Sequence, residues 1–138
     1  MTQDLISDML TRIRNASSVQ HNYTHVPFSR INLNIVNVLA QDGYINSFII
    51  EKSTGTQRWI KVFLRYKGWW IKKPTFSIIK RISTPGHRVF ASYKDFRKKV
   101  DLLKYEYGIA VISTSSGIMS NLKAAKLKKG GEILCYIG

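Results

Sequence analysis

Residues 108–119 read GIAVISTSSGIM, and this stretch decides the fold of the C-terminal half of the chain. Its apolar first part, with β-branched Ile and Val, predicts a buried strand over residues 109–114. The strand runs into small hydroxyl residues and a glycine, which predict a tight loop: Ser113, Thr114, Ser115, Ser116 and Gly117. Hydroxyls held at the end of a rigid strand can bind ribose 2′-OH groups, phosphates and base edges. In a chain with a formal net charge of +14, this loop indicates an RNA-binding surface; a plain polar turn is the alternative.

The regions around this strand predict an α+β fold. Apolar residues at helical spacing predict a helix over residues 3–17, and Ser29 as N-cap with Gly43 as terminator predicts a second helix. From residue 44 the pattern changes to strands. We expect these strands at residues 44–51, 58–66, 76–82, 87–92, 109–114 and 132–137. A short helix is expected to open at Ser120, and residues 93–104 fit a short helix or an irregular loop equally well.

A boundary between two domains is predicted near Pro85. The pair Pro85-Gly86 after Ser83 predicts a type II turn. We therefore expect an N-terminal α/β domain over residues 1–84, with two helices on a small three-stranded sheet. A smaller, mostly β domain with one short helix would occupy residues 85–138. A chain of 138 residues with 44% hydrophobic residues can bury a core without disulfides, so the single cysteine, Cys135, is expected to be a buried, inert thiol.

The charge is concentrated in the middle of the chain. Residues 1–50 contain equal numbers of acidic and basic side chains, whereas residues 58–104 contain fourteen basic and two acidic ones. This asymmetry predicts that the first third of the chain packs or contacts other proteins and that the basic middle binds a polyanion. Basic clusters interleaved with aromatic residues are typical of phosphate contact with base stacking: Lys72-Lys73, Lys80-Arg81 and Arg97-Lys98-Lys99. A solvated charged surface is the alternative for each cluster, and core packing is the alternative for the aromatic residues.

The sequence shows no catalytic or cofactor-binding constellation, so we expect a binding protein with no cofactor. There is no P-loop string, and no carboxylate is placed to orient a histidine against a loop serine. His21 and His25 have a spacing that can bind metal on a helix, but they precede Pro27 in an expected loop and lack a third ligand. No apolar run reaches the length of a membrane span, and the first residues resemble neither a signal peptide nor a transit peptide.

Several motifs, in order, resemble the eighth protein of the bacterial-type small ribosomal subunit. They are residues 4–16 centred on DMLTRIRNA, Val26-Pro27 with Ser29-Arg30, Gly43-Tyr44-Ile45, Lys80-Arg81-Ile82-Ser83 followed by Pro85-Gly86 and Arg88-Val89, residues 108–119, and residues 130–136. The resemblance covers essentially the whole chain. It implies a non-catalytic protein that binds the central domain of small-subunit ribosomal RNA, helps to form the platform, and has neighbouring ribosomal proteins as further partners.

The resemblance also implies which residues contact RNA. The Ser-Thr-Ser loop, here Ser113 to Ser115, would dock against an irregular RNA helix, where hydroxyls read shape and 2′-OH groups. Further contacts are expected from the first helix and the proline turn: Thr11, Arg12, Arg14, Asn15, Ser83, Pro85, Gly86 and Arg88. Independently of the resemblance, the basic clusters predict phosphate contacts at Lys72, Lys73 and Lys98.

Three features depart from the family pattern. Ser116 replaces the usual basic residue or glutamine, Glu106-Tyr107-Gly108 replaces Gly-Leu-Gly, and the basic middle with Trp69-Trp70 is longer and more aromatic. Richness in Ile, Asn, Lys and Tyr indicates an AT-rich genome and, without a transit peptide, favours an organelle-encoded copy, plastid before mitochondrion. A bacterial origin is the alternative to an organelle. For the function, the alternatives are a nonspecific architectural DNA- or RNA-binding protein and an enzyme acting on RNA. The enzyme is disfavoured because the sequence shows no catalytic constellation.

Overall fold

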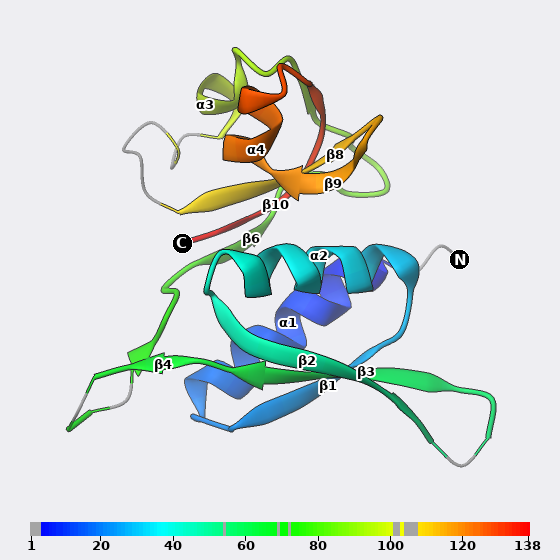
Figure 1. The fold of residues 1–138 in the computed structure, drawn as a ribbon, viewed down its shortest axis with the longest axis vertical. Coiled ribbons are helices and arrows are strands. Elements are labelled where there is room, and N and C mark those ends of the chain that lie inside the picture. The colour runs from blue at the N-terminus through cyan, green and yellow to red at the C-terminus, as the bar shows by residue number, and fades with distance from the viewer. Residues whose placement is uncertain (1–3, 54, 69, 72, 101–102, 104–107) are drawn as a thin grey trace. The chain divides into compact units, whose positions relative to one another are not determined.

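The computed structural model describes residues 4–53, 55–68, 70–71, 73–100, 103 and 108–138 (Figure 1). The chain divides into two compact units, Gln3–Ser77 and Ile78–Gly138. The boundary predicted from the sequence, between residues 84 and 85, lies about seven residues later than the observed one. The difference arises because strand β6 (Ile79–Arg81) pairs with β10 (Gly131–Ile137), so the segment before the proline turn joins the C-terminal sheet. The predicted α+β fold, with helices packed on antiparallel sheets, is confirmed.

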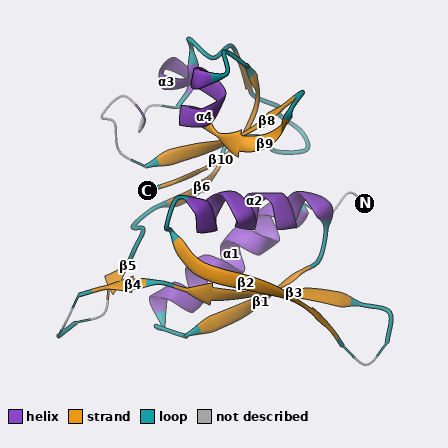
Figure 2. Ribbon diagram, viewed as in Figure 1, coloured by secondary structure: helices purple, strands orange, loops and turns teal. Residues whose placement is uncertain are grey.

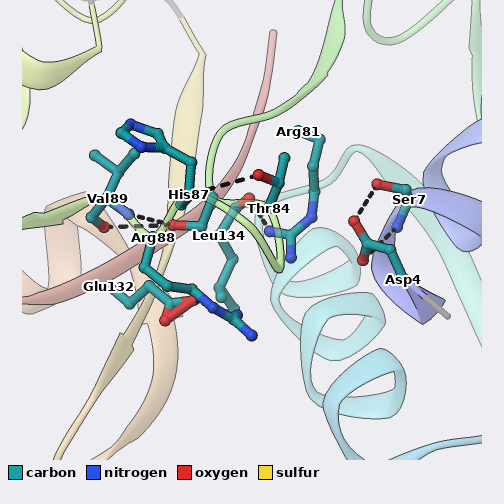
Figure 3. Close-up of polar contacts among 10 residues, drawn as sticks. Asp4, Ser7, Arg81, Thr84, His87, Arg88, Val89, Glu132 and Leu134 are labelled. Carbon is teal, nitrogen blue, oxygen red and sulfur yellow. Dashed lines mark hydrogen bonds and ion pairs between the residues drawn. The ribbon is translucent and has the colours of Figure 1, made fainter. Parts of the chain in front are cut away.

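The first unit contains the two predicted helices, α1 (Leu5–Ser18) and α2 (Arg30–Gln41). Asp4 caps α1, because its carboxylate accepts a hydrogen bond from the Ser7 backbone N–H at 3.2 Å (Figure 3). Ser29 caps α2 in the same way, accepting from the Asn32 N–H at 3.1 Å. Gly43 follows α2 with a φ of +79°, a left-handed conformation that glycine adopts without strain.

The sheet of the first unit has the strand order β1-β3-β2. Strands β2 (Ile45–Lys52) and β3 (Arg58–Leu64) form the predicted hairpin. The third strand is β1 (Tyr23–Pro27), not the expected segment 76–82. The expectation that His25 lies in a loop was therefore wrong. Pro27 is tolerated because β1 is an edge strand, where a missing N–H breaks no ladder on the open side.

The helices cover one face of this sheet (Figure 2). Alternate residues of β3 point to that face and are buried, namely Ile60, Val62 and Leu64. They pack in a core with apolar residues of the helices such as Met9, Ile13, Ile35 and Leu39, which are at most 1% exposed. After β3 the chain continues into a short ribbon of β4 (Tyr66–Lys67) and β5 (Lys73–Pro74).

The second unit is built around β10, which lies at the centre of its sheet. On one side β10 pairs with β8 (Ile109–Thr114), and β8 pairs with β9 (Gly117–Ser120). On its other side β10 pairs with β6 and with β7 (Phe90–Ala91). The described residues of the unit also form two short helices, α3 (Phe96–Lys99) and α4 (Asn121–Lys126). Ser120 caps α4, as predicted, by accepting from the Lys123 N–H at 3.2 Å.

Strand β9 was not expected, and β7 is shorter than the predicted strand over residues 87–92. Residues 117–120 have a glycine and a serine among four positions, so their own pattern is weak, and pairing with buried β8 makes them a strand. The core of this unit combines strand residues with apolar residues of the helical segments: Ala110, Ile112, Met119, Ile133, Tyr136, Phe96, Val100, Leu103 and Ala124.

Cys135 on β10 is 1% exposed, and burial raises the pKa of its thiol to about 12, with a smaller opposing effect from Arg81. We expect the native protein to resist a thiol reagent at pH 8 and to react fully in denaturant, since the thiolate is the nucleophile. Because burial raises the pKa of this thiol in the folded protein, its contribution to the free energy of unfolding is fully present below its ordinary pKa. That contribution is lost as the pH rises from the ordinary value through about 12. Ellman's reagent measures the reaction, and rapid modification of the native protein would contradict the burial.

Candidate RNA interface

The hydroxyl loop is the turn of the β8–β9 hairpin. Thr114 pairs with Gly117 at the end of the ladder, and Ser115 and Ser116 form the exposed tip between them. The Thr114 hydroxyl donates to the Gly117 carbonyl oxygen at 2.8 Å and accepts from the Ser116 N–H at 3.1 Å. Thr114 therefore holds the shape of the turn, whereas the two serines present their hydroxyls to solvent.

The tip of this turn is suited to close contact with a polar surface. Among the described residues, neither the Ser115 nor the Ser116 hydroxyl has a hydrogen-bond partner, so both can donate and accept. Gly117 has a φ of +114°, and a Cβ built there meets nothing within 4 Å. Its backbone is therefore open to an approaching ligand, and a bulkier residue would be strained as well as obstructive.

The base of the turn is held rigidly by β10. Gly131 on β10 lies against the turn, since a Cβ added there would be 2.1 Å from the Ser113 carbonyl oxygen. Ser113 is paired with Glu132, and Glu132 is paired on its other side with Phe90. These pairings place Ser113, Glu132 and Phe90 side by side at one end of the sheet, where Phe90 is 62% exposed.

Arg88 joins the same end of the sheet. Its guanidinium donates to the Glu132 carboxylate at 3.1 Å (Figure 3), and its side chain is 49% exposed while that of Glu132 is 16% exposed. The ion pair fixes the position of Arg88 and partly offsets its charge. Arg88 and the hydroxyl turn are therefore the two predicted site elements that the fold of this unit brings together.

The proline turn itself is exposed, with Thr84 and His87 exchanging two backbone hydrogen bonds across Pro85-Gly86. The predicted type II geometry was wrong, because Gly86 does not have the positive φ that this turn requires. Ser83 also differs from its predicted role. It is 0% exposed, and its hydroxyl accepts from the Val89 N–H at 2.9 Å. Ser83 therefore fixes the turn instead of reaching a ligand.

A group of lysines on and after α4 was missed by the sequence analysis. Helix α4 follows β9 directly, and its outer side and the turn after it are strongly basic: Lys123, Lys126, Lys128 and Lys129. No acidic residue lies between residues 107 and 131, which is the signal that could have identified this cluster. These ammonium groups belong to the same unit as the hydroxyl turn and can contact phosphates.

The predicted contacts of the first unit lie on exposed positions of α1, at Thr11, Arg12, Arg14 and Asn15. Arg12 is the most constrained of them. Its guanidinium bonds the Asp8 carboxylate at 3.2 Å and the His25 carbonyl oxygen at 3.4 Å, and lies 5.7 Å from the centre of the Trp59 ring. Arg12 lines two surface cavities, one of about 380 Å³ together with Trp59 and one of about 470 Å³ together with Asn15.

The remaining predicted lysines are scattered. Lys73 is exposed on β5, Lys98 is 80% exposed on α3 with Asp95 at 3.5 Å, and Lys72 lies outside the described residues. Within the described ranges, no three His, Cys, Asp or Glu side chains gather to bind a metal; His25 instead bonds Glu51 at 2.9 Å. Of the helices that the structure describes, none has the length and apolar character needed to cross a membrane.

Comparison with known proteins shows the family of this chain. The family described as ribosomal protein S8 matches residues 4–137. The small ribosomal subunit protein uS8c of Phaeodactylum tricornutum (strain CCAP 1055/1) is 44% identical over 137 residues, covering 99% of both chains. The uS8 protein of Synechococcus sp. (strain RCC307) is 44% identical over 134 residues, covering 97% of this chain and 96% of the relative. The uS8c protein of Cyanidium caldarium is also 44% identical, over 139 residues and 99% of both chains. This chain belongs to the ribosomal protein S8 family.

Proposed function

We propose that this protein is a structural, non-catalytic constituent of the small ribosomal subunit that binds the central domain of the subunit's RNA early in assembly. The observation that carries the proposal is the hydroxyl turn at Ser113–Gly117. Its shape is fixed by Thr114, its base is held by β10, and its two serine hydroxyls are exposed. The family membership supports the same role.

The turn is suited to RNA more than to duplex DNA. Serine hydroxyls can donate to and accept from a 2′-OH, which DNA lacks and which RNA displays in its wide, shallow minor groove. Arg88, held by Glu132 at the same end of the sheet, and the lysines of the α4 segment supply contacts to phosphates on either side of the groove. Ser116 contributes a hydroxyl, and not a charge, at its position.

Neighbouring ribosomal proteins are the second class of partner in this proposal. The first fifty residues are electrically neutral, and a neutral surface attracts RNA weakly. We propose a plastid ribosome as the location. The family relatives support it, since they include proteins named uS8c as well as uS8 proteins such as that of Synechococcus.

A binding titration of the full chain tests the function. We expect central-domain small-subunit RNA to bind more tightly than a scrambled RNA or a DNA duplex of equal length. The preference should survive high salt, because hydroxyl and base contacts release no counterions. Gel-shift titrations at moderate and high salt measure this preference. Equal binding to all three nucleic acids, collapsing together as salt rises, would overturn the proposal in favour of a nonspecific basic protein.

A further inference from the structure

The ribbon of β4 and β5 forms a protruding arm, which covers the stretch 65–75 and is described at residues 65–68, 70–71 and 73–75. Figure 1 shows β4 continuing beyond the end of β3. The base of the arm is fastened to the first unit on both strands. The Tyr66 hydroxyl donates to the His21 carbonyl oxygen, and the Thr75 hydroxyl donates to the Tyr44 carbonyl oxygen at 2.7 Å. These two hydrogen bonds hold the base of the arm in a defined position on the first unit.

The tip of the arm carries large apolar side chains in solvent. Trp70 is 92% exposed and Ile71 is 66% exposed, so neither adds to the core of the unit. Gly68 gives the tip its shape. Its φ is +104°, and a Cβ at this position would lie 2.3 Å from the Ile71 carbonyl oxygen. An exposed tryptophan next to another exposed apolar residue marks an interaction site.

The charge around the tip selects the kind of partner. The arm contains Arg65, Lys67, Lys72 and Lys73 and no acidic residue, and the acid-free stretch extends from residue 52 to residue 94. Lysine is depleted in the buried centres of protein–protein interfaces. In contrast, an aromatic side chain flanked by lysines is the arrangement that binds single-stranded nucleic acid, where bases stack on the ring and phosphates meet the ammonium groups.

We propose that the arm is a second RNA contact, in which Trp70 stacks on an unpaired base while Lys67 and Lys73 contact the adjacent phosphates. Ile71 covers the edge of the stacked base and excludes water. The ligand class is a bulged or single-stranded stretch of RNA, distinct from the irregular helix assigned to the hydroxyl turn. The inference rests on the proposed function only for the source of that RNA.

Binding of the full chain to two probes tests the arm. One probe is the central-domain small-subunit RNA, and the other is an unstructured single-stranded RNA of about ten nucleotides. We expect Trp70→Ala to weaken binding to the single-stranded probe about tenfold, as loss of one stacked base does, with an unchanged salt slope. Trp70→Phe should retain most of the affinity. Lys67→Ala and Lys73→Ala should each reduce the salt slope by about one unit or less.

Two further variants separate stacking from general damage. Gly68→Ala keeps every charge and aromatic ring but strains the tip, so it should lower single-stranded binding as Trp70→Ala does. Ile49→Ala removes apolar surface from a residue that is 47% exposed in the same unit, outside the arm, and should bind both probes as the wild type does. Fluorescence anisotropy with a labelled probe measures all of these affinities.

Each outcome decides one of the two proposals. If Trp70→Ala binds the single-stranded probe as the wild type does, the stacking contact is overturned. Unchanged RNA binding together with lost incorporation into subunit particles would assign the tip to a neighbouring protein, which also overturns it. If Trp70→Ala weakens the single-stranded probe while wild type shows no preference for central-domain RNA, the arm stands and the proposed function falls.

Discussion

Gly131→Ala is expected to lower the free energy of unfolding of the C-terminal unit by about 3 kcal/mol, the upper end of overpacking penalties. The added Cβ would lie 2.1 Å from the Ser113 carbonyl oxygen and 2.9 Å from its carbonyl carbon. Both are backbone atoms of the adjacent strand, so no side chain can swing away to make room. Relief requires β8 and β10 to separate where the hydroxyl turn begins.

Cysteine labelling measures this loss, because Cys135 lies on β10 and is buried. In a urea titration, the Gly131→Ala variant should become reactive at a lower denaturant concentration than the wild type. All three tryptophans belong to the first unit, so their fluorescence reports that unit separately. Gly86→Ala is the matched control, since its added Cβ meets nothing within 4 Å. Equal labelling curves for wild type and Gly131→Ala would contradict the close packing of the two strands.

Thr114→Ala is expected to weaken binding to central-domain small-subunit RNA by about five- to 150-fold, or 1–3 kcal/mol. The loss has two sources. The variant removes the hydroxyl that links the Gly117 carbonyl oxygen to the Ser116 N–H, so the tip loses its fixed shape. Those two backbone groups would then lack a partner at a dehydrated RNA surface.

Thr114→Ser keeps the hydroxyl and should retain most of the affinity, which makes it the control for the lost methyl group. Ser115→Ala leaves the turn intact and removes one exposed hydroxyl, so it tests direct contact without reshaping the loop. Gel-shift titrations against central-domain and scrambled RNA measure all three variants. If Thr114→Ala weakens both RNAs equally, the turn has no part in selecting the RNA.

The sequence predicted the helices and strands that are determined by residues close to one another in the chain. Both long helices and the cap at Ser29 follow from helical periodicity and side-chain chemistry within a few residues. The β2–β3 hairpin and strand β8 follow from alternation and from an apolar run. The hydroxyl turn was also placed at the end of its strand, because a strand that meets small polar residues and a glycine must turn.

The errors arose where distant pairing decides the structure. Strand β1 has only one fully buried residue, Val26, and becomes a strand because β3 pairs with it. Residues 79–81 have a strand-like pattern, but nothing local shows that their partner is β10 and not β3. Because β6 pairs with β10 and β1 takes its place beside β3, the third strand of the first sheet and the domain boundary both differ from the prediction.

The candidate site was predicted by residue type but not by the role of each residue. Ser83 and Thr114 are both hydroxyl residues next to a turn, yet Ser83 is buried against Val89 and Thr114 fixes the shape of an exposed turn. Such roles depend on burial, which adjacent sequence does not determine. The lysines of the α4 segment were missed because their contribution to the regional charge is offset by Glu106 and Glu132.

The position of β10 in its sheet sets an order of events during synthesis. Strands β6, β7 and β8 all pair with β10, and a chain made from its N-terminus produces β10 after every one of them. Gln3–Ser77 has all its strand partners much earlier and can fold while translation continues. A nascent chain stalled before residue 131 would then hold a folded first unit and no supported hydroxyl turn. The proposed capacity to select RNA would therefore appear only after β10 has been synthesised and has paired with β8.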